Sequence, residues 1–362
     1  MSKAAELAAL ISSQSALSDR NIIINGAMQV AQRGDVTGIT GESYGGPDRF
    51  ELNASSIGTF TISQSSTAPT GFKNSWKVDC TTADASPAAG DLLRVSYRIE
   101  GQDLQQLAYG TSGAKAITLS FYVRSNKTGT YNVQFQQIDN SFKQAVLSYT
   151  ISSADTWEFK SITVPGDTSG LINDDNGDGL ALFWILGAGS TFTSGGERST
   201  YTAFANGDVA PTQTVNLADN TANEWMITGV QLEVGEQATP FEHRSFADEC
   251  ERCKRYYQKS YVDGVAAGTV TQTGCSMNAV PTSGNTWRYT HDFYHQMRAT
   301  PTFTFYVPDT GTSGSGGFEG AGDTNKEAIV VAFSSNKSAV YYSTSMDQTG
   351  FFMWHYELNA EL

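Results

Sequence analysis

Short strand-like segments separated by turn residues occupy most of this chain between about residues 22 and 245. Clusters of Gly, Asn, Asp and Ser stand between them, as is typical of antiparallel β proteins. No helical pattern comes between these segments, which disfavours βαβ units and a parallel sheet. The clearest segments are Thr59–Ile62, Ile117–Val123, Tyr131–Gln136, Trp157–Val164, Leu180–Leu186 and Glu224–Leu232. The sequence therefore predicts an all-β fold, with an antiparallel β-sandwich over this region.

One segment, Leu180–Leu186 (LALFWIL), is apolar at every position. A strand that is apolar on both faces must be covered on both sides, so we expect it inside the sandwich. The composition agrees with extended β structure, because the chain contains 35 Gly, 19 Phe and 16 Tyr. Charged residues make up only 17% of the chain, against ~25% in typical globular proteins. The polar surface must therefore consist largely of uncharged side chains.

The segment 246–259 interrupts the β pattern and predicts a helix that links two β regions. Asp248 and Arg252 stand four residues apart, as do Glu251 and Arg255, and such pairs support a helix. Strand patterns return from residue 261 to the end of the chain. They lie at Thr302–Val307, Ala328–Phe333, Ala339–Ser343 and Phe351–Leu358. We expect a second, smaller β domain there.

Residues 2–17 predict a short N-terminal helix, because Leu7, Leu10 and Ile11 recur near helical spacing. A helix this short is marginal in water on its own. It must pack on its own domain, on sister chains or on a docking partner.

The net charge, the lengths of the apolar runs and the number of cysteines indicate the environment of the chain. The 23 Lys and Arg against 37 Asp and Glu give a net charge of −14, which argues against nucleic acid and anionic membranes as partners. No apolar run is long enough to insert into a membrane. Glu6 interrupts the apolar N-terminus, so we expect no secretory signal. Four cysteines are too few for a disulfide framework, which points to folding in a reducing cytoplasm.

One acidic loop has a pattern suited to calcium. Asp174, Asn176 and Asp178 alternate before Gly179, and oxygen ligands at alternating positions beside a Gly turn suit Ca²⁺. An EF-hand is excluded, because its twelfth position would be Ile185 and not Glu. The other interpretation is a polar loop between strands without a cofactor.

Three further patterns carry chemistry only weakly. Gly41–Gly45 matches G-x-S-x-G, but no strand precedes it and no helix follows it, as a nucleophile elbow requires. Cys250 and Cys253 lack the second ligand pair of a structural zinc site and fit inward packing on a helix. His291 and His295 share a strand face with aromatic residues, which indicates core or interface. We expect no enzyme.

Aromatic rings exposed in loops are the usual means of holding a sugar, because a ring face packs on the C–H face of a pyranose. We expect this role for Tyr44, Tyr109 and Phe318, which stand in loop-like sequence. The tryptophans in strand-like segments are better explained as core residues. These are Trp76, Trp157, Trp184 and Trp225.

Three blocks resemble one group of bacteriophage virion proteins, of the tail-fibre and carbohydrate-binding-like structural type. The first block is SDRNIIINGAMQVAQRG at 18–34, followed by PDRF at 47–50. The second is GVQLEVGEQATPFEHRSFADECERCKRYY at 229–257, in which LEVG-x-x-ATPFE resembles the close of a jelly-roll domain and runs into a helix ending in CxRYY. The third is MRATPTFTFY at 297–306, with a last strand ending in ELNAEL at 357–362.

The resemblance implies a jelly roll like a carbohydrate-binding module and a homotrimer. It implies four parts: an arm at 1–45 for docking or trimerisation, a jelly roll at 46–245, a linking helix at 246–260 and a C-terminal β-sandwich at 261–362. Leu7, Leu10, Ile11, Ile22 and Ile24 would then contact other virion proteins or sister chains.

The function that the resemblance implies is a tail fibre or receptor-binding protein, located on the virion and made in the host cytoplasm. It would attach the particle to host surface polysaccharide. Two alternatives remain open. One is a head-fibre or decoration protein on the capsid. The other is a glycan depolymerase, for which the chain shows neither a long repeated β-helix nor a catalytic constellation.

Overall fold

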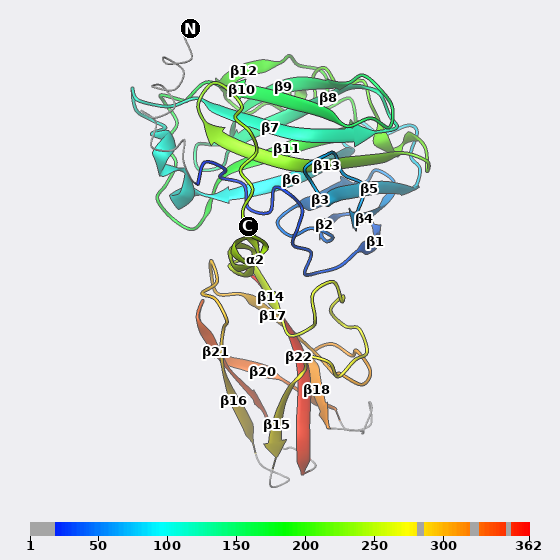
Figure 1. Ribbon diagram of the computed structural model, residues 1–362, viewed down its shortest axis with the longest axis vertical. Coiled ribbons are helices and arrows are strands. Elements are labelled where there is room, and N and C mark those ends of the chain that lie inside the picture. Colours follow the sequence, from blue (N-terminus) through cyan, green and yellow to red (C-terminus); the bar gives the residue numbers. More distant parts are fainter. Residues whose placement is uncertain (1–18, 281–285, 319–325, 345–348) are drawn as a thin grey trace.

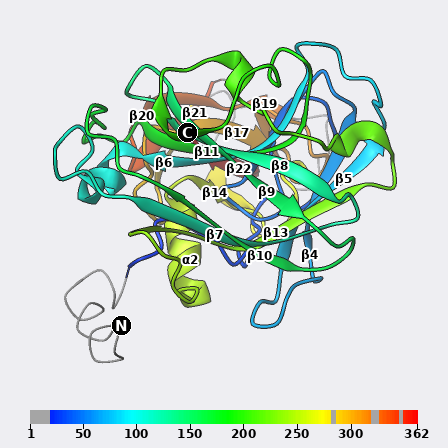
Figure 2. The ribbon, with the colours of Figure 1, turned by 90° about the horizontal axis from the view of Figure 1, so that it is seen from above.

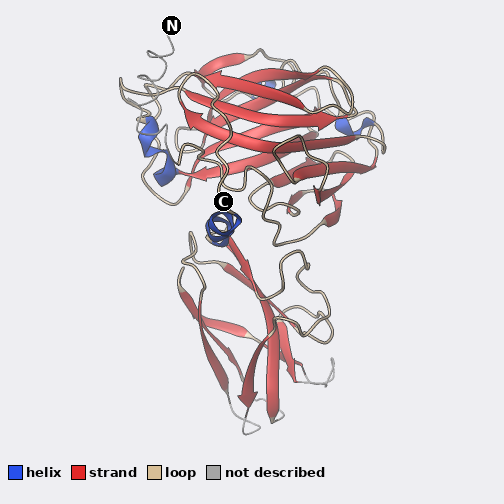
Figure 3. Ribbon diagram, in the orientation of Figure 1, coloured by secondary structure: helices blue, strands red, loops and turns tan. Residues whose placement is uncertain are grey.

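The computed structural model describes residues 19–280, 286–318, 326–344 and 349–362, and it contains two β regions with a helix between them (Figure 1). Strands dominate both regions, and helices are short and few (Figure 3). Seen from above, the second region lies beneath the first along the long axis of the molecule (Figure 2). The predicted all-β fold, with a large sandwich, a smaller β domain and a linking helix, is confirmed. The predicted N-terminal helix lies outside the described residues.

The first region is a sandwich of two antiparallel sheets. One sheet has six strands in the order β1-β4-β5-β13-β7-β10, and the other has seven in the order β12-β9-β8-β11-β6-β3-β2. The strands are β1 (Val36–Ile39), β2 (Glu42–Tyr44), β3 (Glu51–Ser55), β4 (Thr59–Ser65), β5 (Ser75–Thr82), β6 (Leu92–Glu100), β7 (Ile117–Ser125), β8 (Gly129–Gln137), β9 (Lys143–Ile151), β10 (Glu158–Val164), β11 (Asp178–Ala188), β12 (Arg198–Thr202) and β13 (Glu224–Val234). Short 3₁₀ helices lie at η2 (Gly101–Leu107), η3 (Asn206–Asp208) and η4 (Leu217–Asp219).

Strand β11 is buried on both faces, as its apolar sequence predicts. Leu182 and Trp184 point into the main core between the sheets. Phe183 and Ile185 point outward and are covered by a second cluster that includes Val209. The stretches on either side of β12, residues 189–197 and 203–216, therefore cover the outer face of the seven-stranded sheet, and we call them together the lid loop.

The segment from Asp19 to Arg33 is built into the sandwich. Ile23 and Met28 are fully buried in the main core, and the backbone N–H of Ile22 donates to the carbonyl of Leu232. Asn25 is also buried and holds a turn, because its side chain bonds both the N–H and the carbonyl of Val30. These residues lie against the chain's own β13 and core rather than on a separate arm.

Helix α2 (Phe246–Lys254) follows the sandwich and leads into the second region. Ser245 caps it by accepting a hydrogen bond from the N–H of Asp248, and Arg252 pairs with Asp248 at 3.1 Å as the spacing predicts. Cys250 and Cys253 face inward, since the helix buries one stripe against Val30.

The second region is smaller and is built around the long strand β22. One sheet has the order β14-β22-β18-β19, with β15 and β17 also paired to β22, and a three-stranded sheet has the order β16-β21-β20. The strands are β14 (Tyr257–Lys259), β15 (Ser276–Val280), β16 (Trp287–Asp292), β17 (Thr302–Tyr306), β18 (Ser315–Phe318), β19 (Lys326–Ala328), β20 (Val330–Ser334), β21 (Ser338–Ser343) and β22 (Gly350–Asn359). Its core is largely aromatic, with Trp354, Phe352 and Tyr341 at the centre.

Buried ion pairs join the two regions. Glu100 at the end of β6 is fully buried and accepts hydrogen bonds from Arg255 at 2.7 and 2.8 Å and from the Tyr256 hydroxyl at 2.6 Å. Glu361 lies between Arg33 and Arg49 of the sandwich. A charge buried without a partner is costly, so these contacts hold the regions in one arrangement.

No helix in the described part of the chain has the length and apolar character to span a membrane.

Candidate functional site

An open groove lined by aromatic side chains lies on the outer face of the six-stranded sheet. Its walls are Phe72, Tyr122, Phe159, Phe241 and His243, and we call it the aromatic groove. Its volume is about 560 Å³. Such a ring cluster at the surface is unusual, because large apolar side chains are normally drawn into the core.

Sheet register places two of these rings side by side. Tyr122 of β7 stands directly opposite Phe159 of β10, and their ring centroids are 5.2 Å apart. Successive side chains of a strand point to opposite faces, so the neighbouring Phe121 and Val123 enter the core while Tyr122 faces outward. Phe159 is 50% exposed.

Two loops supply the other rings. Phe72, in the connection between β4 and β5, has ring centroid distances of 5.6 Å to Tyr122, 5.0 Å to Phe241 and 5.3 Å to His243. Phe241 and His243 follow β13, and their ring centroids are 4.9 Å apart. Edge and tilted contacts of this kind favour a defined arrangement of rings.

A bulge in β13 makes room for the rings. The register with β7 shifts between Thr228 and Gln231, and Gly229 within this bulge has a φ of +62°. A Cβ atom at Gly229 would stand 2.7 Å from Phe72 and 3.0 Å from Tyr122. Glycine is therefore required both by the backbone and by the packing of the rings.

Hydrogen bonds from buried groups fix both loops of the groove. Glu233 accepts from the backbone N–H of Thr239 at 2.8 Å and from its hydroxyl at 2.7 Å. The hydroxyl of Thr228 donates to the carbonyl of Asn74 at 2.8 Å. These bonds hold the two loops in one arrangement, which reduces the entropy lost on binding.

The groove continues into a second cavity of about 400 Å³, which shares Phe72 and His243 with the first and reaches Phe246, a residue 54% exposed. Among the described residues lining the two cavities none is acidic, although the chain carries a net charge of −14. Lys73 and the hydroxyl residues Thr70, Ser120 and Thr239 provide polar groups beside the rings. This chemistry suits a ligand with apolar faces and hydroxyl groups.

The three aromatic residues assigned to sugar from the sequence lie elsewhere. Tyr109 and Phe318 are 4% and 3% exposed, because Tyr201 and Phe352 cover their rings. The expectation that these two rings are exposed is wrong. Tyr44 is half-buried at the junction of the two regions, where its hydroxyl donates to the carbonyl of Leu362. None of the three lies in the aromatic groove.

The acidic loop predicted for calcium is engaged within the protein. Asp178 pairs with Arg98 at 2.5 Å. The side-chain amide of Asn176 donates to the carbonyl of Arg298 at 2.6 Å, and the Arg298 side chain donates back to the carbonyl of Asn176. In the described part of the chain no group of three or more His, Cys, Asp and Glu residues could hold a metal ion. The loop thus connects the sandwich to the second region, and the calcium site stays a prediction.

The structure also shows where the three weaker sequence patterns lie, namely the G-x-S-x-G segment, the two neighbouring cysteines and the histidine face. Ser43 of Gly41–Gly45 lies in β2 opposite Leu52, not at a strand-to-helix turn. The thiols of Cys250 and Cys253 are buried, and burial raises the pKa of both. His291 is 9% exposed within the second core and bonds the Tyr341 hydroxyl at 2.7 Å.

The residues predicted for docking divide into two sets. Leu7, Leu10 and Ile11 lie outside the described residues. Ile22 packs against the main core and Ile24 against the cluster of Cys250 and Cys253, so both serve the chain's own packing in this structure. A docking role for these side chains stays a prediction.

No family model matches the chain, and no curated protein matches it by sequence. Solved structures overlap parts of it. An enzymatically active domain of tailspike protein 4 of bacteriophage CBA120 matches at 10% identity and a TM-score of 0.31, over 59% of this chain and 21% of that one. A protein from Bacteroides thetaiotaomicron described as sugar-binding matches at 13% identity and 0.33, over 59% and 100%. The C-terminal family 22 carbohydrate-binding module of Clostridium thermocellum Xyn10B matches at 11% and 0.31, over 55% and 98%.

These similarities are too low to establish a family or a function. The chain spans about a fifth of the tailspike domain that it overlaps. What the structure itself defines is an all-β protein whose larger sandwich carries a preformed, open aromatic groove.

Proposed function

We propose that this chain is a non-enzymatic structural protein of a bacteriophage virion, and that its aromatic groove holds neutral sugar residues of a host surface polysaccharide. The observation that carries the proposal is a row of partly exposed rings, with Phe159 and Tyr122 on the sheet face and Phe72 and Phe241 in the two loops beside it.

The chemistry of the groove supports sugar over other ligands. Ring faces pack on the C–H faces of pyranoses, and the hydroxyls beside them supply hydrogen bonds. No Asp, Glu, Lys or Arg stands among the described residues that line the aromatic groove, which suits a neutral glycan. An open groove, unlike a closed pocket, also admits the middle of a polymer. Individual sites of this kind bind weakly, and a homotrimer would raise the avidity of the particle for a repetitive polysaccharide.

The test uses affinity electrophoresis of the full chain through gels that contain soluble neutral polysaccharides, namely a β-glucan, a xylan and a mannan. Tyr122→Ala removes the central ring and should weaken binding roughly tenfold, the effect of losing about 1.4 kcal/mol. Phe333→Ala is the matched control, because it removes a ring that is 75% exposed in the second region. Equal retardation of all three proteins would place the contact outside the groove.

The same cluster of rings would also suit contact between copies of the chain. Sedimentation of the wild type and of Tyr122→Ala separates the two explanations. If the variant changes the oligomeric state and no polysaccharide retards the wild type, the groove is an interface between chains and the sugar proposal is rejected.

The placement on a tail fibre or receptor-binding protein rests on the resemblance of residues 18–34, 229–257 and 297–306 to phage virion proteins. A capsid head fibre or decoration protein is the alternative, and electron microscopy of the particle with this chain located in it decides between them. A depolymerase is the third alternative. It predicts new reducing ends when the protein is incubated with a polysaccharide that it binds.

A further inference from the structure

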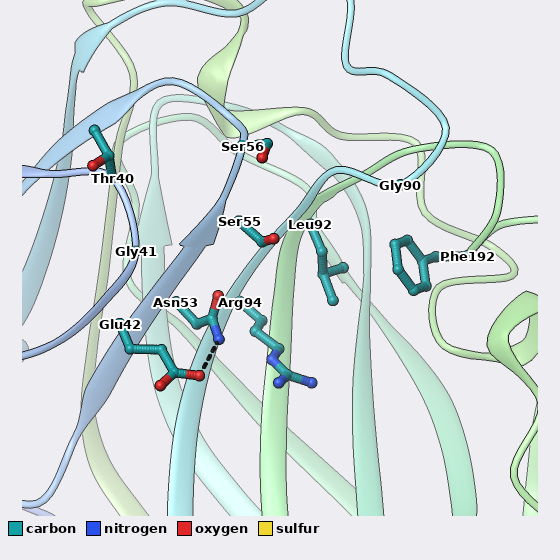
Figure 4. A pocket seen from close by; sticks show the side chains of 10 residues that line it. All are labelled: Thr40, Gly41, Glu42, Asn53, Ser55, Ser56, Gly90, Leu92, Arg94 and Phe192. Carbon is teal, nitrogen blue, oxygen red and sulfur yellow. Dashed lines mark hydrogen bonds between the residues drawn. The ribbon is translucent and has the colours of Figure 1, made fainter.

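A second pocket lies on the outer face of the other sheet, and it is polar rather than aromatic (Figure 4). Its volume is about 400 Å³. Its floor is a row across three neighbouring strands, because Glu42 of β2 stands opposite Asn53 of β3, and Asn53 stands opposite Arg94 of β6. Phe192, from the lid loop, forms the far wall. We call this site the polar pocket.

Arg94 forms no ion pair, although the carboxylates of Glu51 and Glu42 are near enough to act on its charge. Its guanidinium forms no hydrogen bond or ion pair with any described residue, and its Nε atom is buried without a partner. The other arginines near the sandwich end are paired: Arg98 with Asp178, Arg255 with Glu100, and Arg49 with Glu361. Arg49 and Arg98 also have a buried Nε atom without a hydrogen bond, but each forms an ion pair, so of these four arginines Arg94 is the one that can take an anion from outside.

The orientation of Arg94 is fixed in spite of this. Its guanidinium carbon lies 4.3 Å from the centroid of the Phe183 ring, which is itself fully buried under the lid loop. Burial and the neighbouring charge of Arg98 lower the pKa of Arg94, but an arginine remains charged at neutral pH. The positive charge is therefore held in place at the floor of an open pocket.

Glu42 and Asn53 complete the polar surface. Asn53 donates from its amide to Glu42 Oε1 at 2.9 Å, which orients both side chains. Figure 4 shows their polar ends beside the guanidinium, with the hydroxyl residues Thr40, Ser55 and Ser56 above them and the Phe192 ring across the opening. One cation, several hydroxyl-binding groups and one ring together match a sugar residue that carries an acid.

We propose that the polar pocket binds a carboxylate-bearing sugar residue, with its carboxylate on Arg94, its hydroxyls on Glu42 and Asn53, and its apolar face on Phe192. This site rests on the proposed glycan-binding function but is separate from the aromatic groove. A planar carboxylate matches the two parallel donors of a guanidinium. A phosphate group fits less well, because its second charge would lie close to the carboxylate of Glu42.

The test measures binding of three acidic probes to the full chain by isothermal titration calorimetry. The probes are tetragalacturonic acid, a hyaluronan tetrasaccharide and an α2,8-linked N-acetylneuraminic acid tetramer, each compared with its methyl ester. At least one acid should bind, and esterification should weaken its binding tenfold or more. Arg94→Gln should cause a loss of similar size. Arg288→Gln, which removes the same charge from an exposed position in the second region, should cause none.

Folding does not obscure the result, because Arg94 has no internal ion pair to lose. The melting temperature of Arg94→Gln should stay close to that of the wild type, because only the contact of the guanidinium with Phe183 is lost. The proposal is overturned if no acid binds, or if Arg94→Gln leaves the binding intact. It is also overturned if the methyl esters bind as well as the acids. The fourth contrary outcome is that inorganic phosphate displaces a bound acidic probe as effectively as free acidic sugar does. Tyr122→Ala separates the two sites, since it should weaken neutral-glycan binding roughly tenfold and leave acidic binding unchanged.

Discussion

The ion pairs around Glu361 yield the sharpest test of how the two β regions are held together. The side chain of Glu361 is 4% exposed and lies between Arg33 and Arg49, whose side chains are 9% and 1% exposed. Arg49 also stacks on Tyr256, with its guanidinium carbon 3.4 Å from the ring centroid. Burial opposes the charge of Arg49, yet the Glu361 carboxylate and nearby tyrosines hold its pKa well above the usual value.

The substitution Glu361→Gln keeps the size of the side chain and removes only its charge. Two buried arginines then lose their shared anion. Removing one partner of a buried ion pair costs about 3–5 kcal/mol, so we expect the free energy of unfolding to fall by about that amount. Urea unfolding, followed by the fluorescence of tryptophans in both regions, measures the loss.

The control for this experiment is Asp155→Asn. Asp155 pairs with Arg124 at 2.9 Å, but its side chain is 57% exposed, and exposed pairs contribute at most about 1 kcal/mol. If Glu361→Gln lowers the free energy of unfolding by less than about 1 kcal/mol, as the control does, the ion pairs of Glu361 with Arg33 and Arg49 do not hold the two regions together and the argument is refuted.

Three further outcomes test other parts of the structure. Burial lowers the pKa of His291 from 6.5 to about 4, so stability should fall as the pH drops between those values, by up to about 3 kcal/mol, and His291→Gln should flatten this dependence in urea unfolding. Burial raises the pKa of Glu51 from 4.5 to about 7, so its contribution has the opposite sign: stability falls as the pH rises through that interval, and Glu51→Gln should remove the fall. Gly229→Ala should destabilise the sandwich by about 1 kcal/mol or more and abolish retardation in neutral polysaccharide gels, since its Cβ meets Phe72.

The strands could be predicted because their signal is local. Period-two alternation and turn residues mark each strand without knowledge of its partners. The apolar run of β11 even predicts a covering on both faces, which the lid loop supplies through Val209 and Ala210. The capped helix α2 was likewise visible, since the pair of Asp248 and Arg252 lies within one segment.

The exposure of single aromatic residues could not be predicted in this way. Tyr109 stands in loop-like sequence just after η2, but Tyr201, more than ninety residues later, covers its ring at 5.6 Å between centroids. Phe318 ends β18 and is covered by Phe352 of β22. Exposure depends on which distant segment packs over a residue, and a sequence pattern does not contain that information.

Both proposed sites have the same origin in register and loop placement. The aromatic groove joins Phe72, Tyr122, Phe159 and Phe241 from four separate stretches, and each alone is an ordinary aromatic residue of a strand or a loop. One signal was available, because alternation along ITLSFYV places Tyr122 on the face opposite Phe121. For Arg94 there was none: an arginine four residues before Arg98 on the same face is unremarkable until the structure pairs Arg98 with Asp178 and leaves Arg94 without an ion pair. A missing partner is a property of the folded chain alone, so such a site is found only after every nearby charge has been assigned.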